Sequence, residues 1–220
     1  MRLRPGIIFA LALCFAVSAG GAWADGVAVA NGSFETTSPL TVSCGSGCSY
    51  NGGPIPGWTL TGPGGSFQPS TTFFNLPLPN GSTVAYSNGG TISQILGVTV
   101  QPDSTYTLSV DVGDRLDGLV SNYSIALDDG SATLCSSPTA SNGAITPGTF
   151  ADVILTCSTG ASVTPGDLGI VLTSGGLQID FDNVALSVAQ TPEPASYLLL
   201  GIGLMSMVVF VGLRRIRVSS

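Results

Sequence analysis

The stretch LQIDFDNVALSV, residues 177–188, decides the fold class because its apolar residues repeat every second position. They stand at odd positions up to Phe181 and at even positions from Val184 onward. A two-residue period is typical of a strand with one buried face, and a shift by one residue turns the strand over. The switch predicts either a bulge near Asp182–Asn183 or a strand that is buried on both faces.

Several other stretches alternate in the same way, namely residues 105–112, 123–127, 150–157 and 168–172. Turn sequences such as Asp128-Asp129-Gly130 separate them. No stretch in residues 25–190 has a convincing helical period. The sequence therefore predicts an all-β sandwich of about eight to ten strands. The Gly/Pro/Ser-rich residues 44–72 are predicted to be a long ordered loop region with one short strand near Trp58.

The N-terminus has the three parts of a secretory signal peptide. Arg2 and Arg4 precede an apolar stretch at 6–17, and Ala22-Trp23-Ala24 forms a small-x-small cleavage site. We expect cleavage between Ala24 and Asp25, which removes residues 1–24. A retained N-terminal membrane helix is the alternative.

The C-terminal sequence TPEPASYLLLGIGLMSMVVFVGLRRIRVSS, residues 191–220, contains an uncharged stretch at 196–213. This length is at the lower limit of a transmembrane helix. Three arginines follow, and positive residues stay on the cytoplasmic side. We expect one C-terminal membrane span with the β domain outside the cytoplasm and the C-terminus inside. A buried core helix is the alternative. The three arginines are Arg214, Arg215 and Arg217.

The charge distribution excludes several classes of partner and of catalyst. Residues 25–190 hold 12 of the 13 acidic residues and a single basic residue, Arg115, which is a net charge of about −11. Nucleic acid would repel such a surface. The chain has no His and no Lys, which excludes Ser-His-Asp, Ser-Lys and Schiff-base catalysis. Paired carboxylates remain as the one route to hydrolysis, and we expect a protein without enzymatic activity.

Four cysteines follow the predicted signal peptide, an even number in an exported chain. We expect the local pairs Cys44–Cys48 and Cys135–Cys157. A metal site at the first pair is the alternative. Arg115 stands among Asp111, Asp114 and Asp117, which predicts a salt-bridge hub, with a ligand contact as the alternative.

The tail resembles the PEP-CTERM sorting signal of exopolysaccharide-producing Gram-negative bacteria. The resemblance rests on the order of its three parts: Pro192-Glu193-Pro194, the apolar stretch 196–213 and the basic residues that follow. It implies that an exosortase cuts at or near Pro-Glu-Pro, within a sorting segment at 191–217. The tail also looks like the segment sometimes called the ice-binding protein C-terminal domain, which gives no reason to expect ice binding.

Residues 25–190 resemble, more loosely, galactose-binding-like jelly rolls and carbohydrate-binding modules. The points of match are NGSFE at 31–35, PGWT at 56–59 and FDNV at 181–184. The resemblance implies a jelly-roll-like sandwich and a structural Ca²⁺ held by Glu35 and Asp182, with Asp180 as a further candidate. The alternative for these carboxylates is hydrogen bonding to loop amides. Trp58 is a candidate ligand contact, with a place in the core as its alternative.

These observations together predict an exported cell-surface or extracellular-matrix protein with a non-catalytic structural or interaction role. The alternative is a carbohydrate-binding module that recognises exopolysaccharide and is stabilised by Ca²⁺. The expected partners are exosortase, exopolysaccharide and the inner membrane, through the C-terminal helix. We expect the protein to be anchored there and then, after processing, to reach the cell surface or medium.

Overall fold

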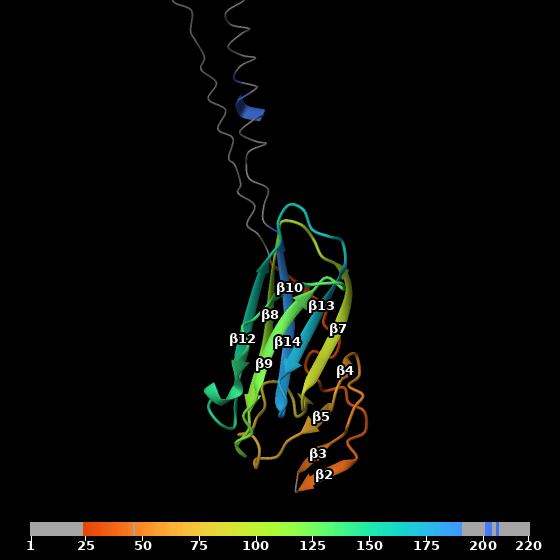
Figure 1. Cartoon of the computed structure of the whole chain (residues 1–220), viewed down its shortest axis with the longest axis vertical. Helices are drawn as coiled ribbons and strands as arrows, with labels where there is room; N and C mark the ends of the chain where they lie inside the picture. Colours follow the sequence, from red (N-terminus) through yellow and green to blue (C-terminus); the bar gives the residue numbers. More distant parts are fainter. Residues whose placement is uncertain (1–23, 46, 191–200, 204–205, 207–220) are drawn as a thin grey trace, which may run out of the picture. The chain divides into compact units, whose positions relative to one another are not determined.

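The computed structural model describes residues 24–45, 47–190, 201–203 and 206. Residues 24–190 form a sandwich of two antiparallel sheets, with 14 strands and one short 3₁₀ helix, η1, at Asn142–Ala144 (Figure 1). The expected all-β sandwich is confirmed, with more strands than the sequence suggested.

The eight-stranded sheet runs in the order β12-β8-β14-β6-β5-β3-β2, and β1 pairs with β14 outside that path. Its long central strands are β8 and β14, which pair from Asp180↔Gly113 to Gln190↔Ser104. The strands of this sheet are β1 (Ala24–Val27), β2 (Val42–Gly45), β3 (Cys48–Tyr50), β5 (Gly64–Gln68), β6 (Val84–Ser87), β8 (Ser104–Asp114), β12 (Thr149–Ser158) and β14 (Ile179–Gln190).

The six-stranded sheet runs in the order β10-β9-β13-β7-β4, with β11 pairing to β9. Alternate residues of both sheets point into the space between them and fill it with aliphatic and aromatic side chains, as in other sandwiches. The strands of this sheet are β4 (Thr59–Thr61), β7 (Gly90–Thr99), β9 (Asn122–Asp128), β10 (Thr133–Ser136), β11 (Ala140–Ser141) and β13 (Asp167–Ser174). The fully buried core residues include Leu108, Val110, Val112, Ile125, Leu127, Ile170, Leu172 and Phe181.

The predicted bulge in β14 is confirmed. Its register against β8 shifts between Asp182 and Ala185, and Asn183 has a φ of 49°. The bulge lets Phe181 and Leu186 both face the core, where each is almost fully buried. Because the side chains alternate, Asp180 and Asp182 point to the opposite, outer face of the sheet.

Residues 44–72 contain three strands, β3, β4 and β5, where the sequence suggested one. The glycines of β5 concealed it, because they are required by close packing within the sheet. A Cβ on Gly65 would lie 2.1 Å from the Asn51 carbonyl oxygen, and one on Gly64 would lie 2.4 Å from that of Tyr86. Glycine in a strand can mark such a close backbone approach.

Both predicted disulfides are confirmed. Cys44–Cys48 closes the β2–β3 hairpin with a Cα–Cα distance of 5.1 Å. Cys135–Cys157 joins β10 of one sheet to β12 of the other at 6.1 Å. The first therefore fixes a local hairpin, and the second ties the two sheets together.

The sequence predictions for the two ends fall mostly outside the described residues. These are the signal peptide before Ala24, the Pro192–Pro194 motif and the basic residues of the tail. Of the predicted span at 196–213, the structure describes Gly201–Gly203 and Ser206, which are helical. None of the helices in the described parts of the chain is long and apolar enough to cross a membrane.

Candidate functional site

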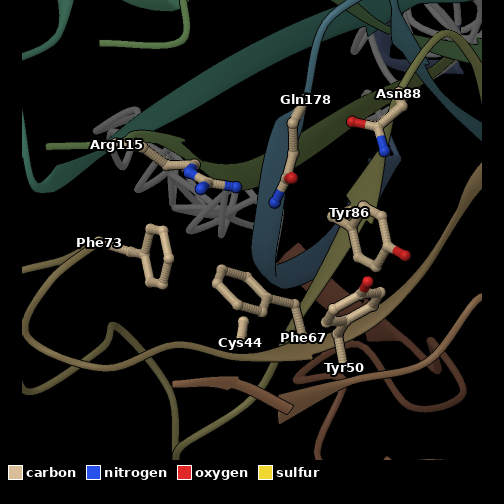
Figure 2. Close-up of a pocket in the computed structure, with 8 residues that line it drawn as sticks. All are labelled: Cys44, Tyr50, Phe67, Phe73, Tyr86, Asn88, Arg115 and Gln178. Atoms are coloured by element: carbon tan, nitrogen blue, oxygen red, sulfur yellow. The ribbon is translucent and has the colours of Figure 1, made fainter. Parts of the chain in front are cut away.

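A pocket of about 260 Å³ lies on the outer face of the eight-stranded sheet. Its position follows from strand register. Phe181 and Ala85 face the core, so their neighbours Asp180 and Tyr86, which pair across β14 and β6, face outward. The pocket is lined by Cys44, Tyr50, Phe67, Phe73, Tyr86, Asn88, Arg115 and Gln178 (Figure 2).

The β2–β3 hairpin forms one wall of the pocket and supplies Cys44 and Tyr50. It is joined to the rest of the sheet at two pairs, Ser49↔Gln68 and Tyr50↔Phe67. The Cys44–Cys48 disulfide closes the same hairpin. The wall is therefore an edge of the sheet with few hydrogen bonds, held in shape by a covalent link.

Four aromatic rings surround the space. Phe67 meets Phe73 edge-on with ring centroids 5.6 Å apart, and it meets Tyr86 in the same way at 6.4 Å. Tyr50 meets Tyr86 at 6.2 Å. The Tyr86 hydroxyl donates a 2.9 Å hydrogen bond to the Asn51 carbonyl, which fixes the ring at its far end. Such edge-on contacts favour a rigid apolar lining.

Arg115 is the charged member of the lining and has only 10% of its side chain exposed. Its guanidinium lies 4.4 Å from the centroid of the Phe73 ring and 5.5 Å from that of Phe67. Its Nε and Nη2 both donate to the carboxylate of Asp117. Within the described residues Asp117 is its one ion-pair partner, so the expected hub that includes Asp111 and Asp114 is not formed.

Asp180 lies next to this lining and is 1% exposed. Its Oδ1 accepts a 2.8 Å hydrogen bond from Nε2 of Gln178, which lines the pocket. Its Oδ2 is buried without a hydrogen-bond partner among the described residues. Burial raises the pKa of Asp180 to about 7, against the lowering effects of the Gln178 hydrogen bond and the Arg115 charge. The carboxyl group is thus partly protonated at neutral pH.

Glu35 and Asp182 both bind the loop before β6, and Asp182 lies two residues after Asp180 on the same outer face of β14. Glu35 accepts hydrogen bonds from the backbone N–H groups of Ser82 (2.8 Å) and Thr83 (2.7 Å). Asp182 accepts one from the N–H of Asn80 at 3.0 Å. The two carboxylates therefore hold the loop directly, as the alternative interpretation of these residues supposed.

The predicted Ca²⁺ site does not gather all three candidates in one place. Burial, together with the nearby charges of Asp111 and Glu35, raises the pKa of Asp182 to about 7, against the lowering effect of its hydrogen bonds from backbone N–H groups. This is the electrostatic environment that a cation would relieve. Among the described residues, however, no group of three or more His, Cys, Asp or Glu side chains is arranged to hold a metal ion.

Trp58 lies in the core and is 7% exposed. Its ring centroid is 5.2 Å from that of Phe34, and its Nε1 donates to the Asn31 carbonyl at 3.1 Å. It is not part of the pocket lining. Ala24 and Asp25, the predicted cleavage site, begin β1 and pair with Ala189 and Val188.

Sequence reasoning did not identify most of the pocket. One signal was available, because the odd-numbered apolar positions before Phe181 place Gln178 and Asp180 together on the other face. The aromatic wall had no such signal, since Tyr50, Phe67 and Phe73 come from the region taken as loop or directly after it.

Fold and site together define a β-sandwich that has a small aromatic pocket on the outer face of one sheet and a buried carboxyl group beside it. The chain belongs to the HpiC1-like family, whose model, described as HpiC1 cyclase, matches residues 25–187. A second model, the PEP-CTERM protein-sorting motif, matches residues 190–215 and confirms the nature of the tail. No curated protein sequence matches the chain.

Solved cyclase structures share the fold. The Stig cyclase Fisc from Fischerella sp. TAU, in complex with (3Z)-3-(1-methyl-2-pyrrolidinylidene)-3H-indole, is 23% identical with a TM-score of 0.64, and the match covers 77% of this chain and 100% of that one. A cyclase from the same organism, in complex with 4-(1H-indol-3-yl)butan-2-one, is 22% identical with a TM-score of 0.62, covering 76% and 99%.

A looser likeness joins the sandwich to carbohydrate-binding modules. The CBM22-1 xylan-binding domain of Paenibacillus barcinonensis Xyn10C is 12% identical with a TM-score of 0.45, covering 63% of this chain and 90% of that domain.

The expectation of a protein without enzymatic activity is wrong. Membership of a cyclase family overturns it. The expectation rested on the absence of His and Lys, which removes nucleophilic triads and Schiff bases but leaves acid catalysis by a carboxyl group. The sequence could not show that one aspartate is buried deeply enough to hold a proton near neutral pH.

Proposed function

We propose that the protein is an exported cyclase that closes a ring in a small aromatic substrate, with Asp180 as the proton donor. The observation that carries the proposal is the Asp180 carboxyl group, which is 1% exposed, has a pKa of about 7 and has one oxygen that finds no partner in the described part of the chain. A general acid works best when its pKa lies near the working pH. We take a bound ligand to be the missing partner of the buried Asp180 Oδ2, because buried polar atoms without a partner are few in native proteins.

The proposed reaction is an isomerisation. The Oδ–H bond of Asp180 breaks and a new C–H bond forms on a substrate alkene, which leaves a carbocation. The π electrons of a second double bond attack that cation and close the ring. Loss of a proton to the Asp180 carboxylate then restores the acid, so that the product has the formula of the substrate.

The lining suits such an intermediate. The faces of Phe67, Phe73 and Tyr86 can stabilise a cation by its attraction to the ring quadrupole. The positive charge of Arg115 would oppose this, but its bidentate pair with Asp117 balances the charge. The aromatic wall would also hold the reacting carbons close together.

The size of the pocket favours a small substrate. About 260 Å³ is at or below the low end of ligand pockets, which begin at roughly 300 Å³. Two of the similar cyclases were solved in complex with indole derivatives. We therefore propose an indole that carries an unsaturated side chain as the substrate class.

The test uses the full-length protein in detergent micelles and a panel of 3-alkenylindoles. Ring closure gives a product of unchanged mass and altered retention in liquid chromatography with mass detection. We expect turnover that falls as the pH rises through about 7, because the protonated form of Asp180 is then lost. Asp180→Asn should reduce turnover by at least a hundredfold, within the usual range for a general acid of roughly 10²–10⁴.

Asp128→Asn is the matched control, since this aspartate is remote from the pocket in the six-stranded sheet. It should leave turnover unchanged. A folded Asp180→Asn variant with wild-type turnover would refute the proposal.

A sugar ring is a second candidate ligand for the same pocket. The observation that favours it is the set of polar side chains, Asn88, Gln178 and Arg115, opposite the rings of Tyr50 and Tyr86 (Figure 2). Saturable binding of the host exopolysaccharide that is lost on Tyr50→Ala would support it. The absence of binding would remove it.

For the tail we propose the role of a temporary membrane stop. The uncharged stretch at 196–213 and the arginines after it support an inner-membrane span with the sandwich outside, and the Pro-Glu-Pro motif supports cutting by an exosortase. Intact mass spectrometry of the protein from its host tests both ends. A chain that begins at Asp25 and ends near Pro194 is the expected result, and a mass that includes the tail contradicts processing.

A further inference from the structure

We infer that Arg115 determines the ligand specificity of the pocket and selects a neutral aromatic ligand with a carbonyl group over the same ligand with a carboxylate. The inference rests on the proposed function for the position of the site and for its aromatic ligand. It adds the polar group that this ligand must carry.

The Arg115 side chain is held rigidly at the edge of the pocket. Phe73 and Phe67 contact its guanidinium through their ring faces, and Asp117 fixes it by two hydrogen bonds. The guanidinium points toward the space between the rings and Gln178 (Figure 2). Because little side-chain freedom is left, binding a ligand here costs little further entropy.

The guanidinium retains hydrogen-bond donors for a ligand. Asp117 uses the edge formed by Nε and Nη2. An arginine has five N–H donors, and among the described residues none accepts a hydrogen bond from Nη1. The second edge, formed by Nη1 and the other hydrogen of Nη2, can therefore donate to one planar oxygen acceptor.

Charge decides which acceptor is preferred. A carboxylate would approach a guanidinium whose charge Asp117 already balances, and it would lie near Asp180, which is ionised in part of the molecules. Residues 25–190 carry a net charge of about −11, which repels an incoming anion. A ketone or amide oxygen accepts the same hydrogen bonds without meeting this repulsion.

The other polar groups of the lining agree with a neutral ligand. Asn88 and Gln178 are uncharged amides, and Nε2 of Gln178 is already used by Asp180. Within the described part of the chain, Arg115 is the one cation that lines this pocket. The charged donor for a ligand oxygen therefore lies at one end of the pocket, which would fix the orientation of the ligand's aromatic ring.

The experiment compares three probes of nearly equal size on the full-length protein in detergent micelles. They are 4-(1H-indol-3-yl)butan-2-one, 3-(1H-indol-3-yl)propanoic acid and 3-butylindole, titrated by calorimetry with a micelle-only control. We expect the ketone to bind roughly tenfold or more tightly than 3-butylindole, since a hydrogen bond to a charged group is worth at least that factor. We expect the same margin over the acid, because the negative charge of the domain repels the carboxylate. Equal binding of the ketone and the acid, or no saturable binding of the ketone, would overturn the inference.

Two variants assign the preference to Arg115. Arg115→Met keeps the length of the side chain and removes the donors, and Arg115→Lys keeps the charge but loses the planar fork. In both, the ketone should lose its advantage over 3-butylindole, whereas Asp128→Asn, in β9 of the other sheet and away from the pocket, should keep it. If Arg115→Met does not fold, Arg115→Lys alone provides the test. A folded variant of either kind with the wild-type preference overturns the inference.

The outcomes also separate this inference from the proposed function. A tenfold ketone preference without ring closure on any substrate would refute the cyclase proposal and leave the specificity of Arg115 standing. Ring closure that depends on Asp180, without any ketone preference, would support the cyclase proposal and refute the specificity of Arg115.

Discussion

Gln178 Nε2 donates a 2.8 Å hydrogen bond to Asp180 Oδ1, so the buried acid is positioned by a side chain that itself lines the pocket. Gln178 immediately precedes β14 and Asp180 is the second residue of that strand, so the two side chains lie on the same side of the extended chain. Of the interactions that lower the pKa of Asp180, this hydrogen bond is the strongest.

Gln178→Leu should therefore raise the pKa of Asp180 further above its ordinary value, because the bond that favours the carboxylate is lost. The pH at which the acid form disappears should move up from about 7. Carboxyl ¹³C NMR titration of Asp180 measures this directly. Asn88→Ala is the control, because it lines the pocket without bonding to Asp180, and an unchanged titration in Gln178→Leu would contradict the prediction.

Thermal stability should fall as the pH rises from about 4 to about 7. Asp180 and Asp182 have folded-state pKa values of about 7, above the ordinary value of 3.8, so the folded chain binds protons that the unfolded chain has released. Their stabilisation is complete below about 4 and is lost as the pH rises through 7. We expect Tm to drop by roughly 5 °C or more. Each unit of pKa difference between the folded and unfolded chain is worth about 1.4 kcal/mol, and a loss of 1 kcal/mol in unfolding free energy lowers Tm by about 2–4 °C.

The double variant Asp180→Asn, Asp182→Asn should flatten this dependence, as followed by circular dichroism. Asp25→Asn, which removes an exposed carboxylate at the start of β1, should not. A wild-type Tm that rises between pH 4 and pH 7 would show that other groups dominate.

The two disulfides should have separable effects. Removing Cys135–Cys157 by Ser substitution should lower Tm more, because its longer loop constrains the unfolded chain by about 3 kcal/mol, against about 2 kcal/mol for Cys44–Cys48. Removing Cys44–Cys48 should weaken ligand binding more, since the hairpin it closes supplies Tyr50 to the pocket. Calorimetry on both variants checks this, and an equal loss of affinity would argue against it.

Glu35→Ala should destabilise the loop before β6 by about 2 kcal/mol, because it removes the carboxylate that accepts hydrogen bonds from the backbone N–H groups of Ser82 and Thr83. We expect Tm to fall by roughly 4–8 °C. Glu35→Gln, whose side-chain oxygen can still accept hydrogen bonds, should lower Tm by less than Glu35→Ala does.

The expected Ca²⁺ has its own test in these variants. A cation held by Glu35 and Asp182 predicts that a chelator lowers the Tm of the wild type and leaves that of Asp182→Asn unchanged. Identical melting curves of the wild type with and without chelator would contradict a calcium site.

Much of the fold could be predicted from the sequence, because strand patterns are local. The alternation in residues 105–112 and 177–188 corresponds to β8 and β14, and the change of parity at Asp182–Asn183 corresponds to the bulge. The cysteine spacing gave both disulfides, and the three-part tail gave its sorting motif. Each of these signals lies within a short stretch of chain.

The site depended on contacts between distant segments, which local patterns do not contain. Tyr50, Phe67 and Tyr86 meet because β3, β5 and β6 are neighbours in one sheet, and Gly-rich sequence hid the middle strand. Arg115 stands beside acidic residues in the chain, yet two phenylalanine rings and one carboxylate surround its guanidinium.

The sequence by itself determined an exported, acidic β-sandwich with two disulfides and a PEP-CTERM tail. Only the tertiary structure decided that Asp180 is a candidate acid, because its raised pKa depends on burial against side chains from other strands. Composition had excluded histidine and lysine chemistry correctly, but the proton affinity of a carboxyl group is set by its surroundings, and these form only when the sheet is complete.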